Sequence, residues 1–229
     1  MEKVNCQFVS QPIFPTPIGV FNFGAINHDL NCDLVDDTFK EYELDPEGKH
    51  FSNVNGWHSR SGLEKEYKSF KKLRSIIEKS AKHYCDFYGY FSDIYCDDLW
   101  TNLNKKNNYN IVHHHGSSYL TGVYYPAKSI VDNIPVFNYT PDEKSLLKPG
   151  VYSSDKLEGT GSLYFLSPTY SDTRTLYKKD INEYTTDTYH IYPTSSILLI
   201  FPSYLLHGVN PFEDDYTRIS ISFAINYNE

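Results

Sequence analysis

Residues 109–126 read YNIVHHHGSSYLTGVYYP, and the interpretation of the whole chain starts from this stretch. Its aromatic and β-branched residues favour a strand, in which successive side chains point to opposite faces. His113 and His115 then share one face, while His114 points to the other. Two histidines on one face predict one edge of a metal site that needs a third ligand. Three histidines in a surface loop are the alternative, and the spacing alone does not separate the two.

A second stretch, residues 201–223, reads FPSYLLHGVNPFEDDYTRISISF and offers the groups that the first one lacks. His207 lies near the end of a returning strand and is the candidate third ligand, although a single histidine is more often a hydrogen-bonded core residue. Arg218 and Ser220 share a face by strand alternation, and a guanidinium can hold a carboxylate through two hydrogen bonds. We therefore expect Arg218 to anchor an anionic cosubstrate beside the metal. A solvated arginine on an exposed strand is the alternative.

The composition limits the class of protein. A chain of 229 residues can form one domain with a substantial core, and we expect residues 1–229 to be a single domain. A net charge of -8 disfavours nucleic acid as a partner, because phosphate binding needs clustered Lys and Arg. The four cysteines include no CxxC pair, which argues against a structural zinc site and a disulfide framework.

The sequence also bears on where the protein acts. We see no signal peptide and no apolar run of the roughly 18 residues that a membrane span needs, so we expect a cytoplasmic protein without membrane contact. An acidic surface makes a peptide or a small molecule a better substrate candidate than DNA or RNA. The oligomeric state is open, with a homodimer as one alternative.

Two segments have helical periodicity, with apolar residues every three or four positions, at residues 28–42 and 64–88. Gly89 ends the second helix. The N-terminal helical part spans about 24–90, and the β core spans about 97–229. Short aromatic and β-branched runs predict strands at residues 99–103, 109–114, 119–125, 162–166, 188–192, 196–201, 205–209 and 218–225. The pattern indicates a mainly β protein with helices (α+β), a cupin-like jelly roll or double-stranded β-helix with the N-terminal helices packed on one face.

Four other regions lead to expectations. Residues 9–23 contain three prolines and should form an extended edge segment that packs across a sheet. Residues 128–160 have no convincing period and are a candidate lid, because a loop of this length is usually functional or disordered. Trp57 and His58 lie in the loop between the helices, where Trp57 is either a wall of the substrate cleft or a hydrophobic plug over the sheet end. Tyr124 and Tyr125 alternate, so one of them faces the cavity, and Tyr125 is a candidate for the cleft.

Several motifs occur in a characteristic order along the chain. They are SNVNGWHS at 52–59, WTN at 100–102, NIVHHH at 110–115, TGVYY at 121–125, FPS at 201–203 and RISISF at 218–223. This order resembles a family of 2OG-Fe(II) oxygenases known from phages and marine bacteria, within the Fe(II)/2-oxoglutarate-dependent dioxygenase superfamily. The resemblance runs from about residue 12 to the C-terminus. Gly116 stands where the family usually has proline, His58 stands where it has glutamine, and the segment 128–160 looks longer than usual.

The resemblance implies a double-stranded β-helix that uses Fe(II) and 2-oxoglutarate. It implies that His113, His115 and His207 bind the iron and that Arg218 with Ser220 grips the distal carboxylate of 2-oxoglutarate. The wider superfamily has a carboxylate at the position of His115.

The implied activity is oxidative decarboxylation of 2-oxoglutarate to succinate, coupled to hydroxylation of an unidentified peptide or small molecule. Tyr109, Asn110 and Asn102 are further candidates for hydrogen bonds to the cosubstrate. Two other functions stay open from the sequence. One is a cupin-like enzyme in which three histidines hold zinc, nickel or iron and no 2-oxoglutarate is used. The other is a jelly-roll binding module without catalytic activity.

Overall fold

The structure, a computed structural model, describes residues 15–139, 147–150, 161–168, 186–211, 213 and 215–228. The described part of the chain contains the helices α1 (His28–Leu44) and α2 (Lys68–Tyr88), with short 3-10 helices at Gly24–Asn27 and Leu63–Lys65. The strands in chain order are β1 (Gly19–Asn22), β2 (Asn53–Val54), β3 (Trp57–His58), β4 (Ile94–Asn104), β5 (Tyr109–His113), β6 (Leu120–Tyr125), β7 (Ser129–Val131), β8 (Ile134–Val136), β9 (Leu147–Gly150), β10 (Leu163–Leu166), β11 (Thr188–Ile191), β12 (Ile197–Pro202), β13 (His207–Val209) and β14 (Arg218–Tyr227).

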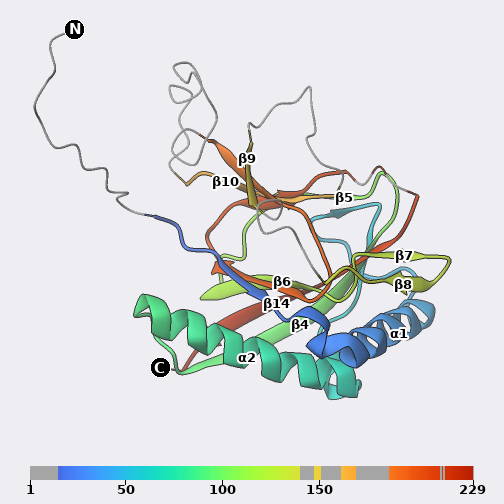
Figure 1. Cartoon of the computed structure of the whole chain (residues 1–229), viewed down its shortest axis with the longest axis horizontal. Coiled ribbons are helices and arrows are strands. Elements are labelled where there is room, and N and C mark those ends of the chain that lie inside the picture. The colour runs from blue at the N-terminus through green and yellow to red at the C-terminus, as the bar shows by residue number, and fades with distance from the viewer. Residues whose placement is uncertain are drawn as a thin grey trace, which may run out of the picture.

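Two six-stranded antiparallel sheets form the β core of the described residues (Figure 1). The first, which we call the major sheet, has the strand order β1-β12-β6-β14-β4-β3, and the second, the minor sheet, has the order β2-β5-β13-β10-β11-β9. Apolar side chains of β6 and β12 pack against those of β10 and β11, so the two sheets face each other. This arrangement agrees with the predicted double-stranded β-helix.

The two helices cover the outer face of the major sheet (Figure 1). The buried stripe of α2 includes Phe70, Leu73 and Ile77, which recur at helical spacing and are fully buried. They belong to one apolar cluster with Ile219 and Ile221 of β14. The helices therefore shield one face of the sheet and leave its other face to the space between the sheets.

Alternation along β14 separates the two faces of the major sheet. Ile219, Ile221 and Phe223 belong to the apolar cluster under the helices. Arg218 and Ser220 occupy the intervening positions and therefore point toward the minor sheet. The RISISF motif thus contributes apolar side chains to the core under the helices on one face and polar side chains to the space between the sheets on the other.

The same alternation decides between the two tyrosines of β6. Tyr124 points to the helical layer, where its hydroxyl donates to Asn31 Oδ1 at 2.6 Å. Tyr125 points between the sheets and packs with Leu163 and Phe165 of β10. Tyr125 is therefore the one that faces the inner space.

Several strands were not predicted from the sequence. β7 and β8 form a hairpin within the candidate lid, and the turn residues Asp132 and Asn133 have φ of 51° and 64°. Two adjacent residues with positive φ are typical of a two-residue hairpin turn, a signal that the analysis of residues 128–160 did not use. β9 lies in the same segment. The rest of that candidate lid, residues 140–146 and 151–160, lies outside the described residues.

The N-terminal edge segment and the helices follow the sequence closely. β1 pairs with β12 at the edge of the major sheet, as expected for residues 9–23, of which 9–14 lie outside the described residues. The first helix ends two residues later than predicted and the second begins four residues later. Within the part of the chain that the structure describes, no helix combines the length and the apolar character that a membrane crossing needs.

Candidate active site

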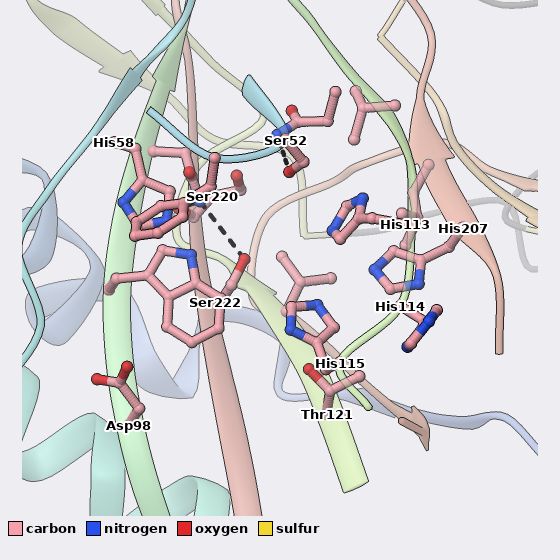
Figure 2. A pocket seen from close by; sticks show the side chains of 18 of the residues that line it. Ser52, His58, Asp98, His113, His114, His115, Thr121, His207, Ser220 and Ser222 are labelled. Carbon is pink, nitrogen blue, oxygen red and sulfur yellow. Dashed lines mark hydrogen bonds between the residues drawn. The ribbon is translucent and has the colours of Figure 1, made fainter. Parts of the chain in front are cut away.

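Three histidines, two on strands of the minor sheet and one just after the end of β5, meet in the space between the sheets (Figure 2). The ring centroids of His113 and His207 are 4.4 Å apart, and the ring of His115 lies 5.2 Å from each of them. One ring nitrogen from each residue lies within 4.8 Å of the other two. This is close enough for one ion to contact all three nitrogens.

Backbone pairing positions each of these rings. His113 and His207 are direct partners in the antiparallel register of β5 and β13. His115 follows the end of β5, and its backbone N–H donates to the carbonyl of Ser203 at 2.9 Å. That bond attaches the histidine stretch to the turn that leads into His207. Ser203 of the FPS motif therefore helps to hold His115 in position beside His207.

The orientation of two rings fits metal binding. Nδ1 of His113 lies 2.8 Å from the carbonyl oxygen of Ile111, and Nδ1 of His207 lies 2.8 Å from that of Leu205. Because a carbonyl oxygen only accepts, Nδ1 carries the proton in both rings and donates it. Nε2 then presents its lone pair, and a hydrogen bond of this kind orients metal-binding histidines and makes them more basic.

Burial keeps the three imidazoles neutral. It lowers the pKa of His113, brings the pKa of His115 to about 4 and brings that of His207 to about 3. The neighbouring histidines lower these values further, because a second positive charge would be close by. Neutral imidazole is the form that binds iron, zinc, copper or nickel. Among the described residues, the donor set is thus three nitrogens without a carboxylate.

A cavity of about 530 Å³ lies beside the histidines and is lined by both sheets. This volume is in the usual range for a small-molecule or cofactor site. The lining residues are Phe51, Ser52, His58, Ser61, Asp98, Trp100, Asn102, Asn110, Ile111, His113, His114, His115, Thr121, Gly122, Val123, Tyr125, Leu163, Phe201, His207, Val209, Ser220 and Ser222.

Polar residues of β4 and β14 form one wall of this cavity. Ser220 is the register partner of Asn102 and lines the cavity with it. The amide nitrogen of Asn102 donates to the hydroxyl of Ser222 and to the backbone oxygen of Ser220, each at 3.4 Å. These contacts fix the amide at the wall, where Ser220 and Asn102 can both offer hydrogen bonds to a ligand.

Arg218 lies on the same face of β14 but behind the cavity wall. Its side chain is almost fully buried, with 2% of the residue exposed, and it is not among the described residues that line the cavity. One of its Nη groups donates to the carbonyl of Gly161. Burial lowers its pKa, and the nearby Tyr125 acts in the opposite direction. Tyr125 itself lines the cavity and lies close enough to the guanidinium for the two groups to interact electrostatically.

A β-bulge decides which residue of β5 faces the cavity. His207 pairs with His113 and Val209 pairs with Asn110, so three steps on β5 match two steps on β13. The extra residue reverses the alternation, and Asn110 reaches the side that His113 occupies. Asn110 lines the cavity, whereas Tyr109 does not. The structure therefore does not bring Tyr109 to the site.

The loop between the helices contributes one of its two candidate residues. His58 lines the cavity and stacks on Trp100, with ring centroids 5.7 Å apart and an angle of 14° between the planes. Trp57 points the other way, because its indole nitrogen donates to the carbonyl of Asp45 and its ring packs edge-on against Tyr42. Trp57 is thus part of the helical core, which is the alternative given for it above.

Some lining residues had no predicted role in the site. Strand alternation places Asp98 and Trp100 on the same face of β4 as Asn102. Trp100 lies within the strand predicted at 99–103 and Asp98 lies just before it, so this signal could have found both residues. His114 was expected to point away from its neighbours, yet it lines the cavity. The reason is that β5 ends at His113, so strand alternation does not apply beyond it.

Comparison with known proteins agrees with this geometry. Residues 98–224, more than half of the chain, match the sequence model of the family described as "Putative 2OG-Fe(II) oxygenase". A search of the curated proteins finds no match. Among solved structures, the chain is similar to a Pseudomonas putida prolyl-4-hydroxylase, with a TM-score of 0.60, 8% identity, and coverage of 93% of this chain and 94% of that one.

Two further structures share the fold at similarly low identity. The epimerase SnoN in complex with Fe3+, alpha ketoglutarate and nogalamycin RO gives a TM-score of 0.59 at 10% identity, covering 93% of this chain and 79% of that one. A Trichoplax adhaerens prolyl hydroxylase in complex with a hypoxia inducible factor peptide fragment gives 0.51 at 12% identity, covering 90% and 83%. These likenesses confirm the double-stranded β-helix predicted from the sequence. The family match confirms the resemblance seen in the motifs, and the chain belongs to the 2OG-Fe(II) oxygenase family, whose members are oxidoreductases that depend on Fe(II) and 2-oxoglutarate.

Proposed function

We propose that this dioxygenase holds Fe(II) on His113, His115 and His207 and hydroxylates a peptide or small molecule bound in the adjoining cavity. The observation that carries the proposal is the convergence of three neutral ring nitrogens within 4.8 Å of one another. Two of the rings already donate Nδ1–H to backbone carbonyls, so their Nε2 lone pairs are free to bind a metal.

The cosubstrate would bind at the Arg218 end of the cavity. A guanidinium can hold a carboxylate through two charge-assisted hydrogen bonds, and Arg218 lies on the face of β14 that points toward the minor sheet. Ser220 and Asn102 line the cavity next to this position, and Tyr125, which also lines the cavity, lies close to Arg218. We therefore assign the distal carboxylate of 2-oxoglutarate to Arg218 and Ser220, with Asn102 and Tyr125 as further hydrogen-bonding partners.

The chain's own residues bind, orient and shield the reacting groups. When bound, iron and 2-oxoglutarate supply the chemistry, in which O2 is consumed, the cosubstrate loses CO2 to give succinate, and one oxygen atom is transferred to the substrate. The three histidines fix the metal at one wall. Apolar side chains such as Val123, Leu163 and Phe201 line the same cavity and exclude water from it.

The substrate class is a proposal that the similar structures support. One of them contains a peptide fragment and another contains nogalamycin RO, so the fold accommodates both peptides and small molecules. We also propose that residues 1–229 act as one domain, because the helical core and the inner core share the major sheet. The family match argues against a silent binding module and against a cupin-like enzyme that does not use 2-oxoglutarate.

The proposal is tested by binding and turnover of the purified protein under anaerobic and aerobic conditions. Iron content, calorimetric titration with 2-oxoglutarate, and succinate formation in air are measured for the wild type and for His113→Ala, His207→Ala and Arg218→Ala. The histidine variants should lose iron, and the arginine variant should keep iron but bind 2-oxoglutarate weakly. Succinate formation that persists in all three variants would contradict the assignment. Iron binding without any response to 2-oxoglutarate would favour the cupin-like alternative.

A further inference from the structure

The cavity extends along β4 and β14 away from the cosubstrate end. Ser220 lies beside the Arg218 end, and Asp98 is the register partner of Ala224, four residues further along β14. At about 3.3 Å per residue, the two positions are separated by about 13 Å along the strand. Figure 2 shows Ser220 and Asp98 in different parts of the view, with His113, His115 and His207 to the right of both. The cavity of about 530 Å³ reaches from Ser220 to Asp98, so it is long enough for a second ligand to lie beside the cosubstrate.

Asp98 sets the charge of this outer end. It is the only Asp, Glu, Lys or Arg among the described residues that line the cavity. Its Oδ2 accepts from the hydroxyl of Ser61 and its Oδ1 accepts from the backbone N–H of Leu99, each at 2.8 Å. These bonds fix the carboxylate, and each oxygen retains a lone pair for another donor. No Lys or Arg of the described chain forms an ion pair with Asp98.

An aromatic wall lies next to this carboxylate. Trp100 occupies the next position on the same face of β4, stacks on His58, and approaches His115 with ring centroids 5.8 Å apart. Phe51 extends the wall beyond His58, with centroids 5.0 Å apart. Indole is the best of the aromatic partners for a cation, and burial lowers the pKa of His58, which keeps it from adding a positive charge. Trp100 thus lies between Asp98 and His115, one of the candidate iron ligands.

We infer that the outer half of the cavity binds a cationic nitrogen group of the substrate, an ammonium or a guanidinium, between Asp98 and the ring of Trp100. The inference rests on the proposed function, because it names the substrate class of the same site. The alkyl stem of such a group would lie along Trp100, which places its carbon atoms on the side of His115 and the iron. The opposite charges at the two ends also keep the two ligands apart, since the carboxylates of 2-oxoglutarate are attracted by Arg218 and repelled by Asp98.

The test compares charged probes with neutral analogues of nearly the same shape. Binding to the anaerobic protein loaded with Fe(II) and 2-oxoglutarate is measured by calorimetry. Nα-acetyl-arginine N-methylamide is compared with the same derivative of citrulline. Nα-acetyl-lysine N-methylamide is compared with the same derivative of 6-hydroxynorleucine. Free L-arginine and L-lysine form a second arm, which separates a free amine from a side chain in a peptide. At least one cationic probe should bind about tenfold or more tightly than its neutral analogue.

Asp98→Asn removes the charge and keeps one oxygen for the bond from Leu99, so it should abolish that preference. Asp97→Asn is the matched control, because Asp97 is exposed, lies outside the cavity lining and accepts from Asn226 at 3.0 Å. It should leave the preference within about twofold of the wild type. Unfolding temperatures of both variants show whether each is folded.

The outcomes distinguish failure of the cation site from failure of the proposed function. Equal binding of charged and neutral probes, no binding of any cationic probe, or a preference that survives Asp98→Asn in a folded protein overturns the inference and leaves the proposed function intact. Iron content and 2-oxoglutarate affinity are measured in the same samples. Failure of the wild type to bind either one overturns the proposed function, and the inference falls with it.

Discussion

His113 and His207 are direct partners in the register of β5 and β13, and their ring centroids lie 4.4 Å apart. Residues that are 94 positions apart in the sequence are thus held together by a backbone ladder rather than by a flexible loop. A site built on paired strands keeps its geometry without a ligand. This explains how the protein can present ring nitrogens in nearly the arrangement that a metal needs.

Removal of a histidine from the cluster should remove the metal. We expect His113→Ala and His207→Ala to lower iron affinity by about 100-fold or more, since loss of a supporting residue alone often costs 10- to 100-fold. The measurement is iron content after dialysis against a weak chelator. His114→Ala is the control, because His114 lines the cavity but lies outside the three-nitrogen cluster, and it should retain iron. Equal iron loss in all three variants would contradict the ligand assignment.

Replacement of Arg218 should affect the cosubstrate more than the metal. We expect Arg218→Ala to weaken 2-oxoglutarate binding by about tenfold or more, because a charge-assisted pair with a carboxylate is lost. The measurement is calorimetric titration of the iron-loaded protein. Arg218 is deeply buried, so Arg218→Lys and Ser220→Ala serve as milder variants that should give smaller losses in the same direction. Unchanged affinity in a folded Arg218→Ala protein would rule out the assigned role.

The β-bulge in β5 makes two adjacent residues unequal. Asn110 lines the cavity and Tyr109 does not, so we expect Asn110→Ala to lower kcat/KM for 2-oxoglutarate by about 3- to 30-fold, the effect of one or two hydrogen bonds. Tyr109→Phe should stay within about twofold of the wild type. Steady-state succinate formation measures both. A larger effect at Tyr109 than at Asn110 would show that the bulge is absent in solution.

The metal-free protein should lose stability as the pH falls below neutrality. The ordinary histidine pKa is 6.5, and burial brings the pKa of His115 to about 4 and that of His207 to about 3 in the folded protein. Between about pH 4 and 6.5 the unfolded chain therefore binds more protons, and stability rises with pH. Each histidine contributes up to about 1.4 kcal/mol per pH unit in this window.

Urea unfolding of the metal-free protein at pH 7 and pH 5 measures this effect. His207→Asn removes one of the titrating groups, so its stability should depend less on pH than that of the wild type. A wild-type free energy of unfolding that is the same at both pH values would contradict the burial of neutral histidines in the folded state.

The major sheet should not tolerate a side chain at Gly122. A Cβ at this position would lie 2.0 Å from the backbone oxygen of Leu199 and 2.4 Å from the ring of Phe223. We expect Gly122→Ala to destabilise the fold by about 3 kcal/mol or more, because a central strand pair must move apart. Gly24→Ala is the control. Its backbone has φ of 54° but nothing lies within 4 Å of the added Cβ, so it should cost only about 1 kcal/mol. Thermal unfolding compares the two, and similar losses would contradict the packing argument.

The sequence by itself determined the two helices, the main strands of the β core and the polarity of their faces. Period-two alternation in RISISF separated Arg218 and Ser220 from Ile219 and Ile221, and the structure places these pairs on opposite faces of the major sheet. Helical periodicity located α1 and α2 within a few residues. Both signals are local, because they depend on how side chains leave the backbone of one element. The histidines of the first stretch and His207 of the second stretch were candidates because of their residue type and the order of the motifs.

Only the tertiary structure decided which face of each strand lines the cavity and at which residue strand alternation stops applying. Trp57 points into the helical core and His58 into the cavity. Strand alternation predicts only that they point to opposite faces, and it does not say which of the two faces the cavity. The bulge opposite β13 brings Asn110, rather than Tyr109, to the site. These outcomes depend on the register between strands and on which layer packs against each face. Such long-range pairings are not encoded in the spacing of residues along one strand.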